Sequence, residues 1–196
     1  MNDKNANKIK WFEKGFEILK ATGAADLTIQ NLTAKLDKTK GAFYHYFKNR
    51  DDYSEQLLRF WEEKQTTDII ALSGQEITFD AINRELTQLS VKNTDLGIEV
   101  AIRAWAIRDP LARAFQERVD QIRLAFLNRL FSLLVDDHEI SRRIALIRYC
   151  FYIGSHQILP GIDKPTYTKA LDTLISMIET YASGVGTARS RYGGTA

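Results

Sequence analysis

The segment 36–52 reads LDKTKGAFYHYFKNRDD and places four aromatic residues beside several basic ones. Lys40, His45 and Lys48 can donate hydrogen bonds to anionic oxygens, and so can the hydroxyl of Tyr44. Donors gathered in this way favour contact with a polyanion. The charge of the chain agrees, because residues 1–50 carry ten Lys or Arg and five Asp or Glu, whereas the rest of the chain is net negative.

The other residues that could take part in catalysis or metal binding are isolated from one another. His45, His138 and His156 do not stand at metal-binding spacing, and no glycine-rich phosphate loop is present. The acidic group at 136–139 resembles a carboxylate–histidine cluster, but a polar linker with helix-capping acids explains it better. We therefore expect no enzyme, metal site or cofactor. The single Cys150 excludes an intramolecular disulfide, and its apolar neighbours predict a buried side chain.

Helical geometry, at about 100° per residue, divides the clustered aromatics between two faces. One face holds Thr39, Ala42, Phe43, Tyr46 and Phe47, and the other holds Lys40, Gly41, Tyr44 and His45. We expect Phe43, Phe47 and Tyr46 to pack inward and Tyr44 to point outward. A helical glycine costs about 1 kcal/mol relative to alanine. It is useful where another molecule must approach the backbone closely.

Short helices must position these side chains. Apolar spacing predicts a first helix on Ile9, Phe12, Phe16 and Leu19. Thr28 can cap a second helix, Thr39 a third that runs through Phe47, and Asn49 a fourth. Two short helices across a tight connection form a helix-turn-helix, whose second helix enters the major groove of DNA. The alternative is an ordinary helical subdomain with a basic face.

The remaining chain predicts longer helices. Thr78 and the Asp109–Pro110 pair mark helix starts, 135–139 is a break, and Pro165 starts the last helix. No segment alternates as a strand does. We predict an all-α fold of about nine helices, with an N-terminal three-helix DNA-binding domain and a larger C-terminal helical bundle. The predicted domains are 5–65 and 66–183, followed by a flexible tail at 184–196.

Composition limits the class of protein. Hydrophobic residues make up 44% of the 196 residues and charged residues 27%, which is enough for a packed core. No stretch approaches the roughly 20 apolar residues of a membrane span. We expect a cytoplasmic protein that does not enter a membrane.

The stretch LTIQNLTAKLDKTKGAFYHYFKNRDDYSEQLL, residues 27–58, resembles the helix-turn-helix of the tetracycline-repressor-like (TetR) family of bacterial transcription regulators. The matching features are Leu27-Thr28, Leu32, Leu36, Thr39-Lys40-Gly41, Phe43-Tyr44-His45, Phe47-Lys48 and Asp51-Asp52. The chain departs from the family at Asp37 and Lys38, where glycine and an aliphatic residue are usual. Aspartate accepts a left-handed backbone at some cost. Lys38 cannot fill an apolar gap, so we expect a more open turn or an added phosphate contact.

The resemblance implies roles for the outward residues. Thr28 and Thr39 would bind phosphates at helix N-termini, and Lys40, Tyr44, His45 and Lys48 would hold the DNA backbone. Gly41, with Lys40 or Tyr44, would approach base edges. It also implies a homodimer on a palindromic double-stranded operator.

For the C-terminal body, the resemblance implies a dimer interface and an effector pocket. The candidate interface residues are Ile147, Phe151, Leu171, Leu174 and Ile178, and the candidate pocket residues are Trp61, Trp105, Phe126, Tyr149 and Tyr152. Each of these could equally be core. An effector near Trp105, between Arg103 and Arg108, would be planar or anionic and would move the fourth helix. The expected function is a repressor released by a small molecule, and the alternative is a helical DNA-binding or adaptor protein without an effector.

Overall fold

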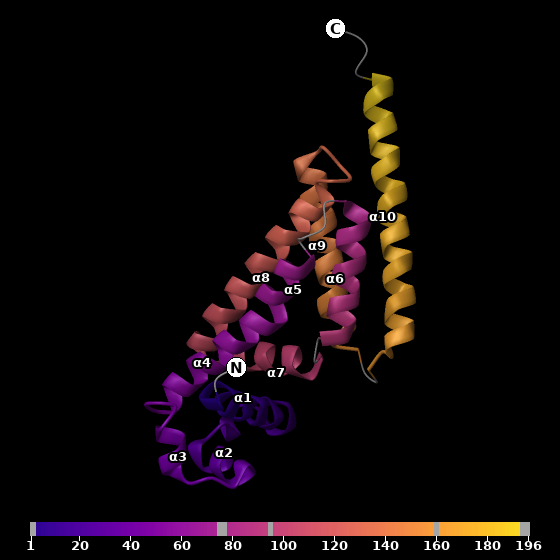
Figure 1. Ribbon diagram of the computed structural model, residues 1–196. Helices are drawn as coiled ribbons and strands as arrows, with labels where there is room; N and C mark the ends of the chain where they lie inside the picture. The colour runs from indigo at the N-terminus through magenta and orange to yellow at the C-terminus, as the bar shows by residue number, and fades with distance from the viewer. Residues whose placement is uncertain (1–2, 74–77, 94–95, 159–160, 193–196) are drawn as a thin grey trace. The chain divides into compact units, whose positions relative to one another are not determined.

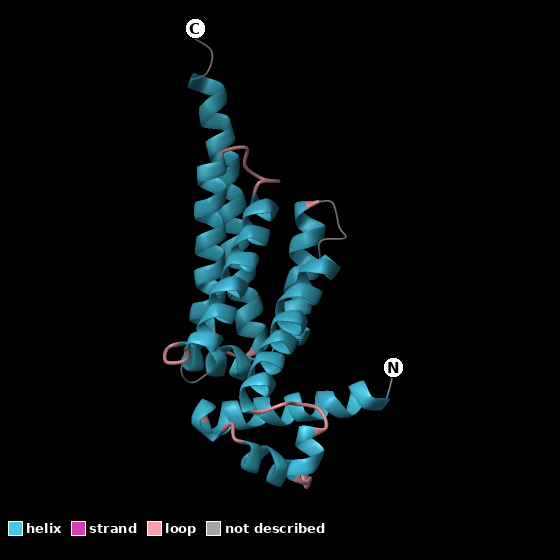
Figure 2. Ribbon diagram, turned by 90° about the vertical axis from the view of Figure 1, so that its left-hand side faces the viewer, coloured by secondary structure: helices cyan, strands magenta, loops and turns pink. Residues whose placement is uncertain are grey.

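The computed structural model describes residues 3–73, 78–93, 96–158 and 161–192, and within them it contains helices and no strand (Figure 2). The helices are α1 (Asp3–Thr22), the 3-10 helix η1 (Ala24–Asp26), α2 (Ile29–Leu36), α3 (Lys40–Tyr44), α4 (Arg50–Glu62), the π-helix η2 (Glu63–Thr67), α5 (Asp68–Ser73), α6 (Phe79–Asn93), α7 (Leu96–Ala106), α8 (Pro110–Phe131), α9 (His138–Ser155) and α10 (Lys164–Tyr192) (Figure 1). Because α4, η2 and α5 are continuous, the described residues form nine segments besides η1. The all-α prediction is confirmed.

Helix starts follow the predicted capping residues. The side chain of Asn49 accepts the N–H of Asp52 at 2.8 Å at the start of α4. Thr78 accepts the N–H of Ala81 before α6, and Asp109 accepts the N–H of Ala112 before α8. Each cap satisfies one of the N–H groups that a first helical turn leaves without a partner.

The chain forms two compact units that interleave in sequence. Unit 1 contains Met1–Asp68 and Asp95–Asp120, and unit 2 contains Ile69–Thr94 and Gln121–Ala196. The predicted domain boundaries at 5–65 and 66–183 stay a prediction. Helix α10 continues to Tyr192, because no proline follows Pro165 to block its hydrogen bonds. Residues 184–192 are thus helical, residues 193–196 lie outside the described ranges, and the flexibility of this tail also stays a prediction.

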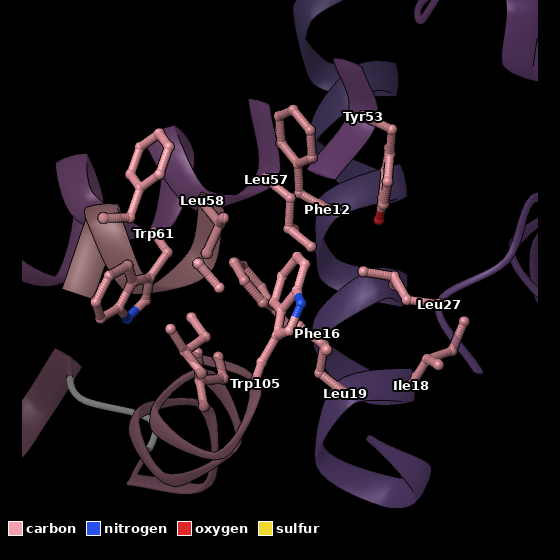
Figure 3. Packing of buried hydrophobic residues seen from close by; sticks show 14 of the residues in the cluster. Phe12, Phe16, Ile18, Leu19, Leu27, Tyr53, Leu57, Leu58, Trp61 and Trp105 are labelled. Carbon is pink, nitrogen blue, oxygen red and sulfur yellow. The ribbon is translucent and has the colours of Figure 1, made fainter. Parts of the chain in front are cut away.

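The core of unit 1 joins α1, α2 and α3 to α4, α7 and the first half of α8. Figure 3 shows Phe12 and Phe16 of α1, Leu57 and Trp61 of α4, and Trp105 of α7 converging on one cluster. Trp61 and Leu57 are fully buried. The helices that carry the candidate DNA surface therefore share a core with α7 and α8.

The core of unit 2 is built from α6, the second half of α8, α9 and α10. Its buried residues include Phe79, Phe131, Ile144, Leu171 and Ile178. The rings of Phe79 and Phe131 pack at 5.6 Å between centroids. None of the helices in the described ranges is both long and apolar enough to cross a membrane.

Candidate nucleic-acid interface

The turn between α2 and α3 is closed by backbone hydrogen bonds. Asp37 has φ 52° and ψ 51°, the left-handed conformation expected of it. The N–H of Lys38 reaches the carbonyl of Thr33 at 3.0 Å, and that of Asp37 reaches Ala34 at 3.3 Å. This pair of bonds is a Schellman motif. The turn is therefore compact, and Lys38 is exposed beside it.

Both helices of the motif start at a threonine. Thr28 accepts the N–H of Asn31 at 3.1 Å, and Thr39 accepts the N–H of Ala42 at 3.2 Å. Each hydroxyl is used as an acceptor, so its own hydrogen is left to donate elsewhere. Thr39 is exposed and Thr28 half-buried.

Helix α3 is shorter than predicted. The regular helix ends at Tyr44, whereas the sequence pattern predicted continuation through Phe47. The N–H of Phe47 still bonds the carbonyl of Phe43 at 3.1 Å, but that of Tyr46 bonds the same carbonyl with the tighter three-residue spacing. A tightened last turn of this kind is common at helix ends.

The predicted division of the aromatics is confirmed. Phe43 and Phe47 are 0% and 1% exposed, whereas Tyr44 is 55% exposed. Tyr46 is half-buried. The ring of Trp11 meets that of Phe43 edge-on, with 5.6 Å between centroids. These contacts anchor α3 to α1 and leave the opposite side of α3 open.

That open side carries the predicted contact residues. Lys40, Gly41, Tyr44, His45 and Lys48 are all exposed. They form, with Thr28 and Thr39, what we call the reading surface. An ideal Cβ built on Gly41 would have Thr39 Oγ1 at 3.6 Å as its nearest neighbour, so the space above this backbone is open. Of these seven residues all but Thr28 are exposed, and their contact with DNA stays a prediction.

Asp52 fixes the segment that carries Lys48. Its carboxylate accepts the backbone N–H of Lys48 at 2.8 Å and the side-chain amide of Gln56 at 2.8 Å. The backbone N–H of Lys48 is the main reason that the pKa of Asp52 lies below its ordinary value. Together with the Asn49 cap, this is a reciprocal arrangement akin to a capping box. It holds the end of the reading surface against the start of α4.

Sequence reasoning missed two further supports. The Nε of Arg50 donates to the carbonyl of Leu27 at 2.8 Å and so ties α4 to the residue before α2 and its cap. Tyr53 donates to the carbonyl of Trp11 at 2.8 Å, and burial raises the pKa of its hydroxyl. Gly15 lies directly against that hydroxyl. Contacts across such sequence distances leave no local pattern.

The five candidate pocket residues are divided between the units. Trp61 and Trp105 are core residues of unit 1, and Phe126 and Tyr149 are core residues of unit 2. Tyr152 is half-buried in unit 2. Their role in binding an effector stays a prediction.

An open depression of about 470 Å³ lies in unit 1 beside α7 and α8, and Arg103 and Arg113 are among its lining residues. Both arginines are already engaged. Arg103 forms an ion pair with Asp120 at 2.7 Å, and Arg113 donates to the carbonyls of Ala106 and Ile107. The expected use of Arg103 on an anionic ligand would therefore compete with Asp120.

The candidate interface residues also differ in exposure. Ile147 is 55% exposed, whereas Leu171 and Ile178 are core residues of unit 2 at 1% and 6%. Phe151 and Leu174 are half-buried. Other apolar side chains on the same two helices are exposed instead, namely Leu146, Met177 and Tyr181. On α10, Met177 lies between the selected positions Leu174 and Ile178, and Tyr181 lies three residues after Ile178.

Cys150 is exposed, which corrects the expectation of a buried residue. It lies three and four residues after Ile147 and Leu146, which are exposed as well. The buried residues Ala145, Arg148 and Tyr149 occupy the other side of α9. An apolar segment alone did not reveal which side of this helix faces the core.

Comparisons with known proteins were made on sequence and on structure. No protein-family model matches the chain, and no curated protein matches it in sequence. A structure from Pseudomonas aeruginosa PAO1, assigned as a transcriptional regulator, aligns with a TM-score of 0.69 and 10% identity, covering 92% of this chain and 93% of that chain.

A TetR-family transcriptional regulator from Streptomyces coelicolor aligns with a TM-score of 0.69 and 15% identity, covering 87% of this chain and 89% of that chain. At such identities the likeness concerns the fold. The chain therefore has the fold of TetR-family transcriptional regulators.

Proposed function

We propose that the protein is a TetR-family transcriptional regulator that binds a palindromic DNA operator as a homodimer. The observation that carries the proposal is the division of α3. Phe43 and Phe47 are buried, while Lys40, Tyr44 and His45 stand exposed on the opposite side. Any amphipathic surface helix divides in this way, but the exposed side here holds hydrogen-bond donors and a glycine and no carboxylate, which suits a helix that lies in the major groove.

Each residue of the reading surface has a role in this proposal. Lys40, Tyr44, His45 and Lys48 bind phosphate oxygens, and the hydroxyls of Thr28 and Thr39 donate to further phosphates. Gly41 allows base edges to come close to the backbone. Phosphate contacts fix position, and the contacts near Gly41 supply sequence discrimination.

A dimer accounts for the exposed apolar residues of α9 and α10. Leu146, Ile147, Met177 and Tyr181 are each more than half exposed. A two-fold interface would cover them on both copies. The two reading surfaces of such a dimer contact the two half-sites of a palindrome.

Regulation is proposed to pass through α4. In unit 1, Arg118 of α8 forms an ion pair with Glu62 of α4 at 2.6 Å, and its guanidinium lies 4.3 Å from the ring centroid of Phe115. A small molecule that shifts α8 would therefore move α4 and, with it, the reading surface. We propose repression that ends when such an effector binds, in a cytoplasmic protein without enzymatic activity. The alternative is a DNA-binding or adaptor protein that has no effector.

Selection of bound DNA from a random pool, followed by titration at several salt concentrations, tests the proposal. We expect a palindromic site. Tyr44→Ala and Lys48→Ala should each weaken binding to every sequence. Lys48→Ala should also reduce the slope of log affinity against log salt concentration by about one for each subunit.

Lys169→Ala is the matched control, because Lys169 is an exposed lysine on α10 in the other unit. It removes the same charge and should leave affinity and slope unchanged. Failure to select any site, or equal behaviour of the Lys48 and Lys169 variants, would overturn the docking of this surface on DNA.

A further inference from the structure

In the described part of unit 2, a buried arginine has no counter-charge. Arg148 of α9 is only 3% exposed. Its Nε has no hydrogen-bond partner, and no carboxylate among the described residues forms an ion pair with it. Its guanidinium carries a positive charge and five N–H donors.

A charge in this position is costly to the free protein. Burial removes the guanidinium from water, and only a partner with opposite charge and good hydrogen-bond geometry offsets that loss. An apolar side chain of similar length would fill the space at lower cost. The retained arginine therefore suits a partner that arrives from outside the chain.

Aromatic side chains lie next to Arg148 on the same helix. Tyr152 is one turn further along α9, close enough for its side chain to meet that of Arg148. The rings of Tyr149 and Tyr152 are stacked at 12° with 6.1 Å between centroids. The guanidinium of Arg123, itself 8% exposed, lies 5.6 Å from the Tyr152 ring. A planar molecule would find flat apolar surfaces here, beside positive charge.

A second polar group without a partner belongs to the same cluster. The hydroxyl of Tyr167 on α10 is buried and makes no hydrogen bond within the described part of the chain. Its ring lies 6.5 Å from that of His156, which in turn lies 4.3 Å from the ring of Tyr152. Tyr152, His156 and Tyr167 are half-buried, so this side of the cluster is reachable from the surface.

We propose that this cluster binds a small aromatic carboxylate. The carboxylate pairs with Arg148, the ring lies against Tyr149 and Tyr152, and the Tyr167 hydroxyl bonds a polar substituent. The inference rests on the proposed function in one respect, namely that this ligand is the effector. The binding site itself stands or fails separately.

Calorimetry and thermal unfolding of the full chain test the site, with benzoate and naphthoate as probes. Benzamide supplies the same ring without charge, and sodium sulfate at equal ionic strength supplies charge without a ring. We expect both carboxylates to raise the unfolding temperature of the wild-type protein, and benzamide and sulfate to leave it nearly unchanged.

Three variants locate the effect. Arg148→Met should weaken carboxylate binding at least about tenfold, as expected for a lost charged hydrogen bond, and should by itself raise the unfolding temperature of the free protein. Arg143→Met, at an exposed arginine of the same helix, should keep both properties of the wild type. Tyr167→Phe should reduce affinity only for probes with a polar ring substituent, such as hydroxybenzoate.

Several outcomes would overturn the site: no binding of either carboxylate, equal binding of benzamide, or binding that survives Arg148→Met. A lower unfolding temperature of free Arg148→Met would also do so, because it would show that contacts within the chain already offset the cost of the buried charge. The operator titration is independent of these results. If benzoate binds through Arg148 but leaves operator affinity unchanged, the site stands and its role as an effector site fails.

Discussion

In the segment from Leu27 to Tyr53, polar side chains form hydrogen bonds that hold the backbone in place. On α9 and α10, among the described residues, some buried polar groups have no hydrogen-bond partner and several apolar side chains are exposed. Arg50 is bonded to the carbonyl of Leu27, and Asp52 accepts two hydrogen bonds. In unit 2, the Nε of Arg148 is buried and has no hydrogen-bond partner among the described residues, and Ile147 is more than half exposed. The first region satisfies these polar groups within the chain, whereas the second has a buried polar group with no partner among the described residues.

The difference separates two uses of a helix. A reading surface must present its donors in fixed positions, because a displaced donor loses a directional hydrogen bond. A body that binds a ligand and a second subunit must leave groups available for them. The proposals above follow from this contrast, and three experiments test it from the largest expected effect to the smallest.

Gly15→Ala tests how tightly α1 packs against α4. A Cβ at Gly15 would collide with the hydroxyl of Tyr53 and lie 3.3 Å from Leu57 Cδ2. We expect a loss of roughly 1–3 kcal/mol of folding free energy, measured by urea denaturation, because a packed core cannot yield.

Gly41→Ala is the matched comparison, since its Cβ would make only an ordinary contact. We expect stability equal to or above that of the wild type, with weaker operator binding. If both glycine variants lost stability equally, the fold and the reading surface would not be separable. If neither did, the tight contact at Gly15 would be disproved.

Ile147→Asp tests whether the exposed face of α9 is open in solution. A charge on each copy within a two-fold interface should weaken the dimer by roughly tenfold, or about 1.4 kcal/mol. Analytical ultracentrifugation measures the change. Leu133→Asp, at a residue that is 54% exposed outside α9 and α10, should leave the dimer intact. A wild-type protein that is monomeric at all concentrations would contradict the proposed dimer interface on α9.

Asp52→Asn gives the smallest effect. The pKa of the Asp52 carboxyl is lowered in the folded protein, so the group stabilises the fold above its ordinary pKa of 3.8 and loses that effect as the pH falls through the lowered value. Since the carboxylate is partly exposed, we expect about 0.5 kcal/mol at neutral pH. The wild-type and variant curves of unfolding free energy against pH should converge in acid.

Asp51→Asn is the control, because it removes the same charge from the same helical turn without the bond to Lys48. Its curve should stay closer to that of the wild type throughout. A larger effect at Asp51 would assign the stabilisation to the helix dipole rather than to the hydrogen bond.

The local features of the helix-turn-helix and of the start of α4 could be predicted well from the sequence. Caps at Thr28, Thr39 and Asn49 depend on residues three positions away, and Asp37 was expected in the left-handed conformation that it adopts. The inward placement of Phe43 follows from helical periodicity alone. Such features are set by near neighbours in the chain, so a pattern of residue types reveals them.

The features that were missed depend on distant residues. Nothing near Gly15 predicts that Tyr53 lies above it, and nothing near Arg50 predicts a bond to Leu27. Cys150 and Arg148 lie two residues apart in one apolar segment, yet the first is exposed and the second buried. Their placement depends on where the neighbouring helices pack, which periodicity along one helix does not determine.

The π-helix η2 shows how such placement is adjusted within a single helix. Leu57 and Trp61 are buried four residues apart, but the next buried position, Thr66, follows after five. A regular α-helix would have rotated Thr66 by about 100° away from that line. The wider turn absorbs one extra residue without a break in the helix. The wider turn thus acts as a change of phase, which lets the buried positions before and after it share one line.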